Sequence, residues 1–306
     1  MTRINLNTQS RKFSFEGIDF NVLLETNESI ISNNLEKTGG WEQNQLCLYN
    51  LLMDDDGVFV DIGANVGINA IFLQKKIPTA KVYCVEASSR NFLLLEKNME
   101  NAECDFINSN VAIADGNGFV NFSGSGTNAK IVLDDNSDNE SIKSMTLDSF
   151  IKSHDITHID LCKIDVEGFT DLVLAESALT RQICHSFIIE FSIGDVSDRF
   201  GFTETKIINH FSELLDQFDT TFSFCYISRN HGCINFKDAD ELYSILIIDQ
   251  YVGDILVTKK DIESSSYSTF LSKIIQELQY QNHLRIEQIA SLSKKNTFKD
   301  FFSFRK

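Results

Sequence analysis

Short apolar runs alternate with helical stretches from about residue 57 to residue 258, and this alternation constrains the fold more than any other feature. The runs have the length of strands, and the stretches between them have apolar residues at helical spacing. Apolar strands separated by helices predict an α/β fold, with a doubly wound, mostly parallel, seven-stranded sheet covered on both faces. The strands are expected within residues 58–62, 81–87, 104–113, 158–168, 185–192, 220–228 and 252–260.

The segments between the strands predict helices and turns with definite ends. Ser88 or Ser89 is a candidate N-cap for the helix that follows it, and Thr203 for the helix over residues 203–218. Residues 169–179 are expected to form one helix. Glycine, asparagine and aspartate punctuate the apolar segments near residues 118–134, which indicates a hairpin or an excursion from the sheet. Acceptor contacts are expected from two loops, residues 123–145 and 192–203.

Three parts of the chain differ in pattern. Residues 1–56 form a polar flank with β-like runs and one helix, expected to pack over the cofactor side of the sheet. Residues 57–260 form the α/β domain. Residues 261–306 form a helical C-terminal tail with an apolar seam that includes Leu271, Ile275 and Leu278, so self-association, a docking contact or packing back on the domain all remain open. The aromatic and basic residues at its end also allow a membrane-surface contact, the less favoured alternative.

Charge and cysteine content narrow the classes of partner. The chain has 44 acidic against 27 basic residues, a formal net charge of -17, which repels phosphate backbones and disfavours nucleic acid. No apolar run has transmembrane or signal-peptide length. The seven cysteines are scattered, without a Cys-x-x-Cys pair, so we expect reduced thiols in a cytoplasmic protein and no zinc site.

The segment FVDIGANVG, residues 59–67, turns from the first strand of the sheet into a helix. A dinucleotide fingerprint would need a second glycine where Asn65 stands, and a pyrophosphate would also meet the charge of Asp61. S-adenosyl-L-methionine fits better, because its ammonium suits Asp61 and its carboxylate suits N–H groups at a helix start. Glu86 lies 25 residues after Asp61, at the end of the next strand. Its carboxylate is a candidate acceptor for the hydroxyls of the cofactor's ribose. The alternative is that Asp61 caps the helix and Glu86 is a solvated loop acid.

Five segments in this order carry a family resemblance: FVDIGANVG, YCVEAS, NVAIADGNG, MTLDSF and LCKIDVEGF. Together they resemble the FkbM-type S-adenosylmethionine-dependent methyltransferases over about residues 40–258. The resemblance implies a class I methyltransferase (Rossmann-like) fold and methyl transfer to a hydroxyl oxygen, typically of a glycan, lipopolysaccharide or natural product. The family's aromatic-Glu pair is matched by Trp41 and Glu42. The cofactor-binding residues expected are Asp61, Gly63, Ala64, Asn65, Gly67, Glu86, Ala87 and Asn110.

The chain departs from the family pattern at two positions. Asn69 stands where a small hydroxyl residue is common, and Thr170 stands where the family usually has another acid. Thr170 leaves an alternative open, in which the protein is a binding or scaffold protein that keeps the fold but does not catalyse methyl transfer. A nicotinamide oxidoreductase is disfavoured by Asn65.

The segment KIDVEG ends the fourth strand and supplies the catalytic candidates Lys163, Asp165 and Glu167. Residues i and i+2 share a face of a strand, so the three side chains can converge unless the turn at Gly168 redirects Glu167. Asp165 is expected to line the methyl end of the cofactor, and Asp165 or Glu167 would act as general base or hold the acceptor hydroxyl. Lys163 would hold a carboxylate in place or lower its pKa. The structural alternatives are an ion pair between Lys163 and Glu167, and Asp165 as a helix cap.

Two further ideas are less favoured. A divalent metal on Asp165, Glu167 and Glu190 is conceivable, because hard cations prefer oxygen ligands. His231, in a loop between the last two strands, is a candidate acceptor contact, and Asn110 is a candidate for the adenine edge or a plain loop residue.

Overall fold

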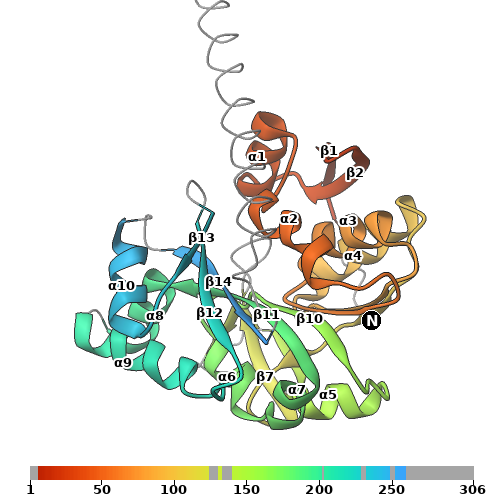
Figure 1. Cartoon of the computed structure of the whole chain (residues 1–306). Helices are drawn as coiled ribbons and strands as arrows, with labels where there is room; N and C mark the ends of the chain where they lie inside the picture. The colour runs from red at the N-terminus through yellow and green to blue at the C-terminus, as the bar shows by residue number, and fades with distance from the viewer. Residues whose placement is uncertain are drawn as a thin grey trace, which may run out of the picture.

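The computed structural model describes residues 6–123, 130–132, 140–201, 203–228, 232–248 and 252–259. The central sheet lies between two layers of helices (Figure 1). Its strands are β3 (Val58–Ile62), β4 (Lys81–Val85), β5 (Ile107–Ser109), β10 (Ile159–Ile164), β11 (Cys184–Ser192), β12 (Ser223–Ser228), β13 (Gly232–Asn235) and β14 (Val252–Thr258). Their order in the sheet is β13-β12-β14-β11-β10-β3-β4-β5.

The sheet is mostly parallel, as predicted. β5, β4, β3, β10 and β11 pair in parallel, while β14 pairs antiparallel with both β11 and β12. The chain builds outward from β3 through β4 to β5, then returns to the other side of β3 with β10. The crevice at the carboxyl ends of β3 and β10 is therefore the switch point of the sheet, where ligands bind in folds of this kind.

The strand count of seven was wrong for the described residues, since β13 adds an eighth strand as an antiparallel partner of β12. The expected strand over residues 104–113 also divides. The side chain of Asn110 donates to the backbone carbonyls of Glu86 and Ala87, and the chain leaves the sheet there. Residues beyond Asn110 join a small second sheet, with β6 (Ala112–Ile113), β7 (Gly118–Ser123), β8 (Lys130–Val132) and β9 (Glu140–Met145) in the order β6-β9-β7-β8. The antiparallel β7–β8 pair is the predicted hairpin.

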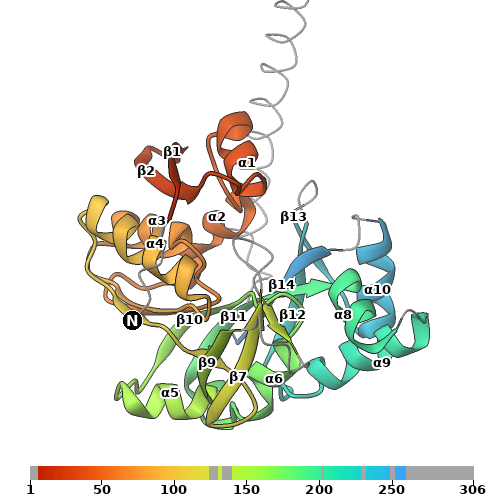
Figure 2. The same cartoon turned by 180° about the vertical axis from the view of Figure 1, so that it is seen from behind.

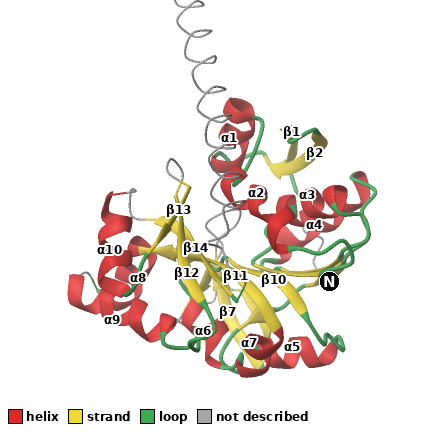
Figure 3. Cartoon of the chain, in the orientation of Figure 1, coloured by secondary structure: helices red, strands yellow, loops and turns green. Residues whose placement is uncertain are grey.

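Helices cover both faces of the central sheet (Figure 3). They are α3 (Ile68–Lys76), α4 (Ser89–Asn101), α5 (Leu147–Ser153), α6 (Thr170–Ala175), α7 (Ala178–Ile183), α8 (Ile193–Phe200), α9 (Glu204–Leu215) and α10 (Ala239–Ile248). Ser88 caps α4 and Thr203 caps α9, each through its side-chain oxygen, as predicted.

Two helix predictions were wrong. The single helix expected over residues 169–179 is broken between α6 and α7, because the Asp148 carboxylate accepts the N–H groups of Leu179 and Thr180 and starts a new helix there. The segment expected to be a loop at residues 192–203 contains α8, which the Ser192 hydroxyl caps by accepting the N–H of Asp195.

The N-terminal flank consists of a hairpin and two helices: β1 (Thr8–Phe15), β2 (Ile18–Glu25), α1 (Ile30–Thr38) and α2 (Gln43–Leu52). It lies on the same face as α3 and α4 (Figure 2). Phe13 and Tyr49 of the flank belong to one buried hydrophobic cluster with Phe59 of β3 and Phe72 of α3. The flank therefore shares a core with the sheet.

Side chains of each strand alternate between two buried clusters. In β10, Leu161 packs with the flank cluster, whereas Cys162 packs with the cluster under α9 and α10 on the opposite face. The same alternation puts Asp61 and Lys163, which are register partners on β3 and β10, on the flank face. A charged pair is thus inserted at the end of an otherwise apolar layer.

Three remaining points concern the whole chain. The C-terminal tail and His231 lie outside the described residues, so the expectations for them stay predictions. No described helix has the length and apolar character needed to cross a bilayer. The six cysteines whose side chains are described are free thiols.

Candidate active site

The corner between β3 and α3 depends on two glycines. Gly63 has a φ of 84°, and a Cβ added there would lie 1.8 Å from the backbone oxygen of Asp165. Gly67 has a φ of 87° and forms the N-cap of α3. The first glycine therefore allows the β3 and β10 corners to touch, and the second lets the helix start at the sheet edge.

Asp61 is completely buried, and among the described residues neither of its carboxylate oxygens has a hydrogen-bond partner. Burial raises the pKa of Asp61 to about 7, against the attraction of Lys163 on the neighbouring strand. Asp61 does not cap α3, because Gly67 occupies that position, so this alternative was wrong. A buried carboxylate without a donor is costly, and it favours binding of a cation or a strong donor.

Glu86 is also buried rather than solvated. Its two carboxylate oxygens accept the N–H groups of Asn65 and Ser88, each at 2.8 Å. Burial raises the pKa of Glu86 to about 7, although these two hydrogen bonds oppose the shift. Glu86 thereby ties the two neighbouring corners together, and its remaining lone pairs can accept further hydrogen bonds.

Asn110 has a structural task next to Glu86. Its amide nitrogen donates to the carbonyls of Glu86 and Ala87 at 2.9 and 3.0 Å, and its oxygen accepts from the Ser89 hydroxyl. Asn110 therefore fixes the backbone on which Glu86 and Ala87 sit.

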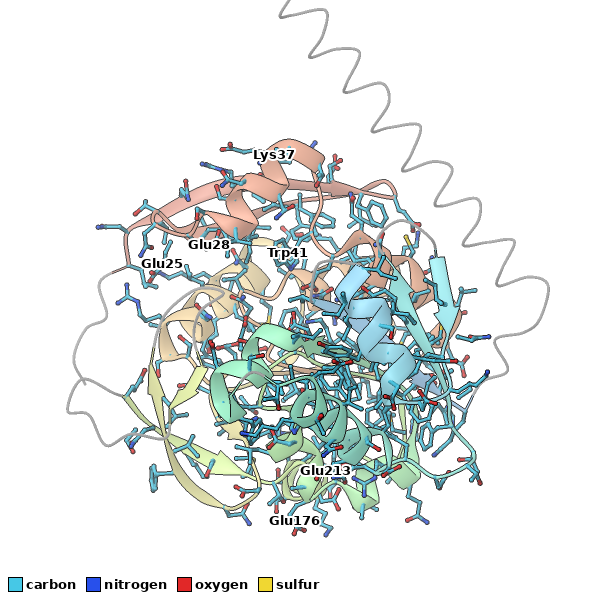
Figure 4. All side chains as sticks on the ribbon, turned by 90° about the vertical axis from the view of Figure 1, so that its left-hand side faces the viewer. Glu25, Glu28, Lys37, Trp41, Glu176 and Glu213 are labelled. Atoms are coloured by element: carbon cyan, nitrogen blue, oxygen red, sulfur yellow. The ribbon has the colours of Figure 1, made fainter. Side chains whose placement is uncertain are left out.

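A cavity of about 220 Å³ opens at the carboxyl ends of β3 and β10. It brings residues of the cofactor corner together with all three catalytic candidates. One of its lining residues, Trp41, can be found beneath α1 in Figure 4, at the end of the molecule opposite Glu176 and Glu213. The residues that line the cavity are Ile30, Ile31, Trp41, Glu42, Gly63, Ala64, Asn65, Val66, Ile68, Asn69, Lys163, Asp165, Glu167 and Glu190.

Lys163 is buried in the floor of this cavity and lies between two carboxylates. Its Nζ donates to Asp165 Oδ2 at 2.8 Å and lies 3.6 Å from Glu42 Oε2. Burial lowers the pKa of Lys163, but the carboxylates outweigh it and hold that pKa well above 10.5. The ion pairs of Lys163 are thus with Asp165 and Glu42, and not with Glu167 as in the structural alternative. Asp165 is not the cap of α6, whose N-cap is Phe169.

Glu167 lies in the turn that follows β10 and lines the same cavity. Glu167 and Gly168 both have left-handed φ values, 51° and 82°. The carboxylate oxygens of Glu167, Glu190 and Asp195 lie within 4.8 Å of one another. These oxygens match the ligand preference of Mg²⁺ or Ca²⁺, although the set includes Asp195 in place of Asp165.

Three residues of the site were not predicted in a role. Arg199 of α8 donates to the carbonyl of Gly168, forms a bidentate pair with Asp171 and stacks on Phe169, so it holds the turn after β10. Glu42 was noted as part of a family pattern and Asn69 as a departure from it. Their hydrogen bond, 2.7 Å from Asn69 Nδ2 to Glu42 Oε2, crosses from the flank to α3.

The model of the FkbM methyltransferase domain matches residues 61–232, more than half of the 306 residues. The chain belongs to the FkbM methyltransferase family. The match includes the β3 corner, Glu86 and the β10 end, but not the flank residue Glu42. Membership confirms the family predicted from the sequence and, with it, S-adenosylmethionine as the cofactor.

Solved structures of other methyltransferases are similar at low identity. An O-methyltransferase from Bacillus cereus in complex with SAH is 15% identical, with 75% of this chain and 86% of that chain covered and a TM-score of 0.43. A SAM-dependent methyltransferase from Agrobacterium tumefaciens is 10% identical, with 84% and 72% covered and a TM-score of 0.44. None of the curated proteins compared with this chain matches it.

The site's own chemistry fits this cofactor. Among the described residues neither oxygen of the Asp61 carboxylate has a hydrogen-bond donor, and the ammonium of the cofactor would supply one. The first turn of α3 begins at the same corner, and helix starts offer backbone N–H groups to a carboxylate. Gly63, where an added Cβ would meet the backbone oxygen of Asp165, keeps this corner in contact with the end of β10.

Proposed function

We propose that this FkbM-family protein transfers a methyl group from S-adenosylmethionine to a hydroxyl oxygen, of a sugar in a glycan, lipopolysaccharide or glycosylated natural product. The observation that carries the proposal is the position of Asp165. Its carboxylate lines the same cavity as Gly63 and Asn65 of the cofactor corner, and it is paired with the buried Lys163. A base beside the methyl donor is what transfer to a hydroxyl needs.

In this proposal the cofactor is held along the ends of β3 and β4. Asp61 takes the ammonium, the start of α3 takes the carboxylate, and Glu86 accepts from the ribose hydroxyls. Asn110 maintains the backbone of Glu86 and Ala87 beside the adenine. When bound, the sulfonium supplies an electrophilic methyl group for in-line displacement.

Asp165 orients the acceptor hydroxyl and takes its proton at a carboxylate oxygen. Lys163 donates to Asp165 Oδ2 and stabilises its charge. Burial and the nearby carboxylates, including a hydrogen bond with Asp165, raise the pKa of Glu190 well above 4.5. Glu190 in its neutral form then limits the negative charge around the base.

The charge of the cavity supports a neutral acceptor. Glu42, Asp165 and Glu167 line it beside the neutral Glu190, and Lys163 is the cation among the lining residues. A phosphorylated or carboxylated acceptor would be repelled, whereas a neutral sugar ring can pack on the Trp41 indole and donate its hydroxyls to the carboxylates.

The first test is calorimetric binding of S-adenosylmethionine and S-adenosylhomocysteine to the wild type, Asp61→Asn and Glu86→Gln. We expect binding by the wild type and a loss of at least about tenfold in each variant, the size of one charge-assisted hydrogen bond. No binding by the wild type would refute the proposal.

The second test is methyl transfer from the labelled cofactor to matched neutral and phosphorylated sugars, with and without EDTA. We expect turnover with neutral acceptors only, no effect of EDTA, and a loss of about 10²-fold or more in Asp165→Asn. Cofactor binding without turnover on any acceptor would favour the catalytically silent scaffold. Loss in EDTA and recovery with Mg²⁺ would instead assign a metal role to Glu167, Glu190 and Asp195.

A further inference from the structure

A continuous series of polar contacts runs from α2 of the flank to Asp165. The Tyr49 hydroxyl donates to Asn69 Oδ1 at 2.9 Å, and Asn69 Nδ2 donates to Glu42 Oε2 at 2.7 Å. Glu42 Oε2 lies 3.6 Å from Lys163 Nζ, which donates to Asp165 Oδ2 at 2.8 Å. The series joins three elements that are far apart in the sequence.

The chemistry of the partners fixes the direction of each hydrogen bond. Burial raises the pKa of Glu42, and Lys163 and the Asn69 amide oppose that shift. The ionised form of Glu42 can only accept, so the NH₂ of Asn69 faces it. The amide oxygen of Asn69 then faces the Tyr49 hydroxyl, which must donate. Burial raises the pKa of Tyr49 well above 10, so the phenol keeps its proton.

The members of this series are withdrawn from solvent. Tyr49 is 0% exposed, Asn69 7% and Lys163 2%, while Glu42 has 18% of its side chain exposed at the cavity wall. Buried hydrogen bonds of this kind hold side chains in one arrangement, because breaking one leaves an unpaired polar group.

The backbone of Glu42 also has a defined conformation. Its φ of 48° is left-handed, and its carbonyl accepts the N–H groups of Gln45 and Leu46 at the start of α2. A non-glycine residue adopts this conformation at a cost, which surrounding contacts must offset. The hydrogen bond from Asn69 is one such contact.

We propose that Glu42 is a positioning residue of the methyl-transfer site, held by Asn69 and Tyr49, and that it acts through Lys163 on the Asp165 carboxylate. This inference rests on the proposed function of Asp165. It assigns the flank a part in the reaction, although the flank lies outside the family match at residues 61–232.

The physical reason is that one ammonium is shared by two carboxylates. Asp165 accepts a hydrogen bond from Lys163 at 2.8 Å, and Glu42 attracts the same ammonium at 3.6 Å, so the position of the ammonium depends on both carboxylates. Without Glu42, Lys163 has lost one of the charges that keep its pKa high, and its hold on Asp165 is set by a single contact.

The charged groups around Glu42 come from three strands. β10 supplies Lys163 and is followed by Asp165, β3 supplies Asp61, and β14 supplies Asp254. The helix α2 adds the Tyr49 phenol, which keeps its proton. Lys163 is the cation among these groups. Removal of the Glu42 charge should therefore lower the pKa of Lys163.

The test uses competitive acetylation of lysines over a pH series, quantified by mass spectrometry, in wild type, Glu42→Gln, Asn69→Leu and Tyr49→Phe. At fixed pH we expect Lys163 to label about tenfold faster in Glu42→Gln, equivalent to about one pKa unit. Asn69→Leu should show a smaller increase, and Tyr49→Phe the smallest. Unchanged labelling of Lys163 in both Glu42→Gln and Asn69→Leu, with unchanged melting temperatures, would overturn the inference.

The matched control is Glu16→Gln, which removes the partner of Lys76 in a 2.9 Å ion pair away from the cavity. It should leave Lys163 labelling and turnover at wild-type values. An equal rise in Lys163 labelling in this control would mean general loosening, and it would also overturn the inference.

Turnover separates this inference from the proposed function. With an active acceptor, Glu42→Gln should lower kcat about tenfold or more, keep the cofactor Kd within about twofold, and move the alkaline limb of the kcat profile to lower pH. A change in KM alone would make Glu42 a direct acceptor contact and overturn the positioning role. If the wild type methylates nothing, the proposed function fails, while the labelling result still decides the link between Glu42 and Lys163.

Discussion

Among the described residues, Asp61 is a buried carboxylate with both oxygens lacking a hydrogen-bond partner. This burial raises its pKa to about 7. Such a residue lowers the unfolding free energy of the unliganded protein, and it stabilises a complex when a ligand supplies the missing partner.

We expect Asp61→Asn to stabilise the unliganded protein at pH 8 by about 1–3 kcal/mol while abolishing cofactor binding, because an amide carries no charge into the buried site. Urea unfolding and calorimetry on the same sample check the two halves. The control is Asp160→Asn, another buried carboxylate, which accepts the N–H of Val58 and whose loss should destabilise. Destabilisation by both substitutions would contradict this account of Asp61.

The sequence was sufficient for residues whose role depends on local pattern. Asp61 and Glu86 follow apolar strands directly, so their place at the sheet edge could be predicted. Glu42 and Asn69 meet only because the flank packs on α3, and no local pattern indicates that contact. The same holds for Lys163, whose second partner lies 121 positions earlier in the chain.

At the scale of elements, α8 controls the turn that follows β10. Its Arg199 bonds the carbonyl of Gly168 and pairs with Asp171 through both guanidinium nitrogens. Gly168 itself cannot carry a side chain, because an added Cβ would lie 2.4 Å from Asp195 Cβ. The turn that places Glu167 is therefore held from outside the strand.

We expect Arg199→Lys to lower turnover more than it lowers cofactor affinity. It should also reduce the free energy of unfolding by about 1–3 kcal/mol, because a lysine ammonium cannot make the bidentate pair with Asp171. Turnover, calorimetry and thermal melting measure these three effects. Arg90→Lys is the control, since Arg90 pairs with Glu25 in the flank region and should leave turnover unchanged. Equal turnover in the wild type and Arg199→Lys would exclude a role for the turn.

The errors in element prediction have identifiable causes. The segment of α8 contains Gly194 and several residues typical of turns, yet Ile193, Val196 and the Ser192 cap are enough once the helix can pack. The break between α6 and α7 depends on Asp148, which is about 30 positions away in sequence. Long strands and capped helices such as α4 were predictable because their signals are local.

For the molecule as a whole, carboxyl groups with raised pKa values make stability depend on pH, and burial raises the pKa of Glu42 and Glu190 among them. Burial raises the pKa of Asp61, Glu86 and Asp254 to about 7 in each case. Between about pH 4 and 7 the folded state therefore binds more protons than the unfolded state. The contribution of these groups is fully present below about pH 4 and is lost as pH rises through 7.

We expect the unliganded protein to lose unfolding free energy between pH 5 and pH 8. The combined variant Asp61→Asn, Glu86→Gln and Asp254→Asn should lose much less over the same interval. Urea unfolding at several pH values measures both slopes. Parallel slopes would show that these carboxyl groups are not the cause.

The shared core of the flank and the sheet has a consequence for synthesis. The flank leaves the ribosome before α3 and α4, yet Phe13, Phe20 and Val22 are buried in a cluster that includes residues of both helices. An emerging hairpin alone leaves its apolar face in water, and two strands are marginal without a covering layer. The nascent chain therefore exposes this face until about residue 101, the end of α4, has left the exit tunnel. The contact of Glu42 with Lys163 forms later, because Lys163 is synthesised later. Chaperone capture of the growing chain should concentrate in that interval.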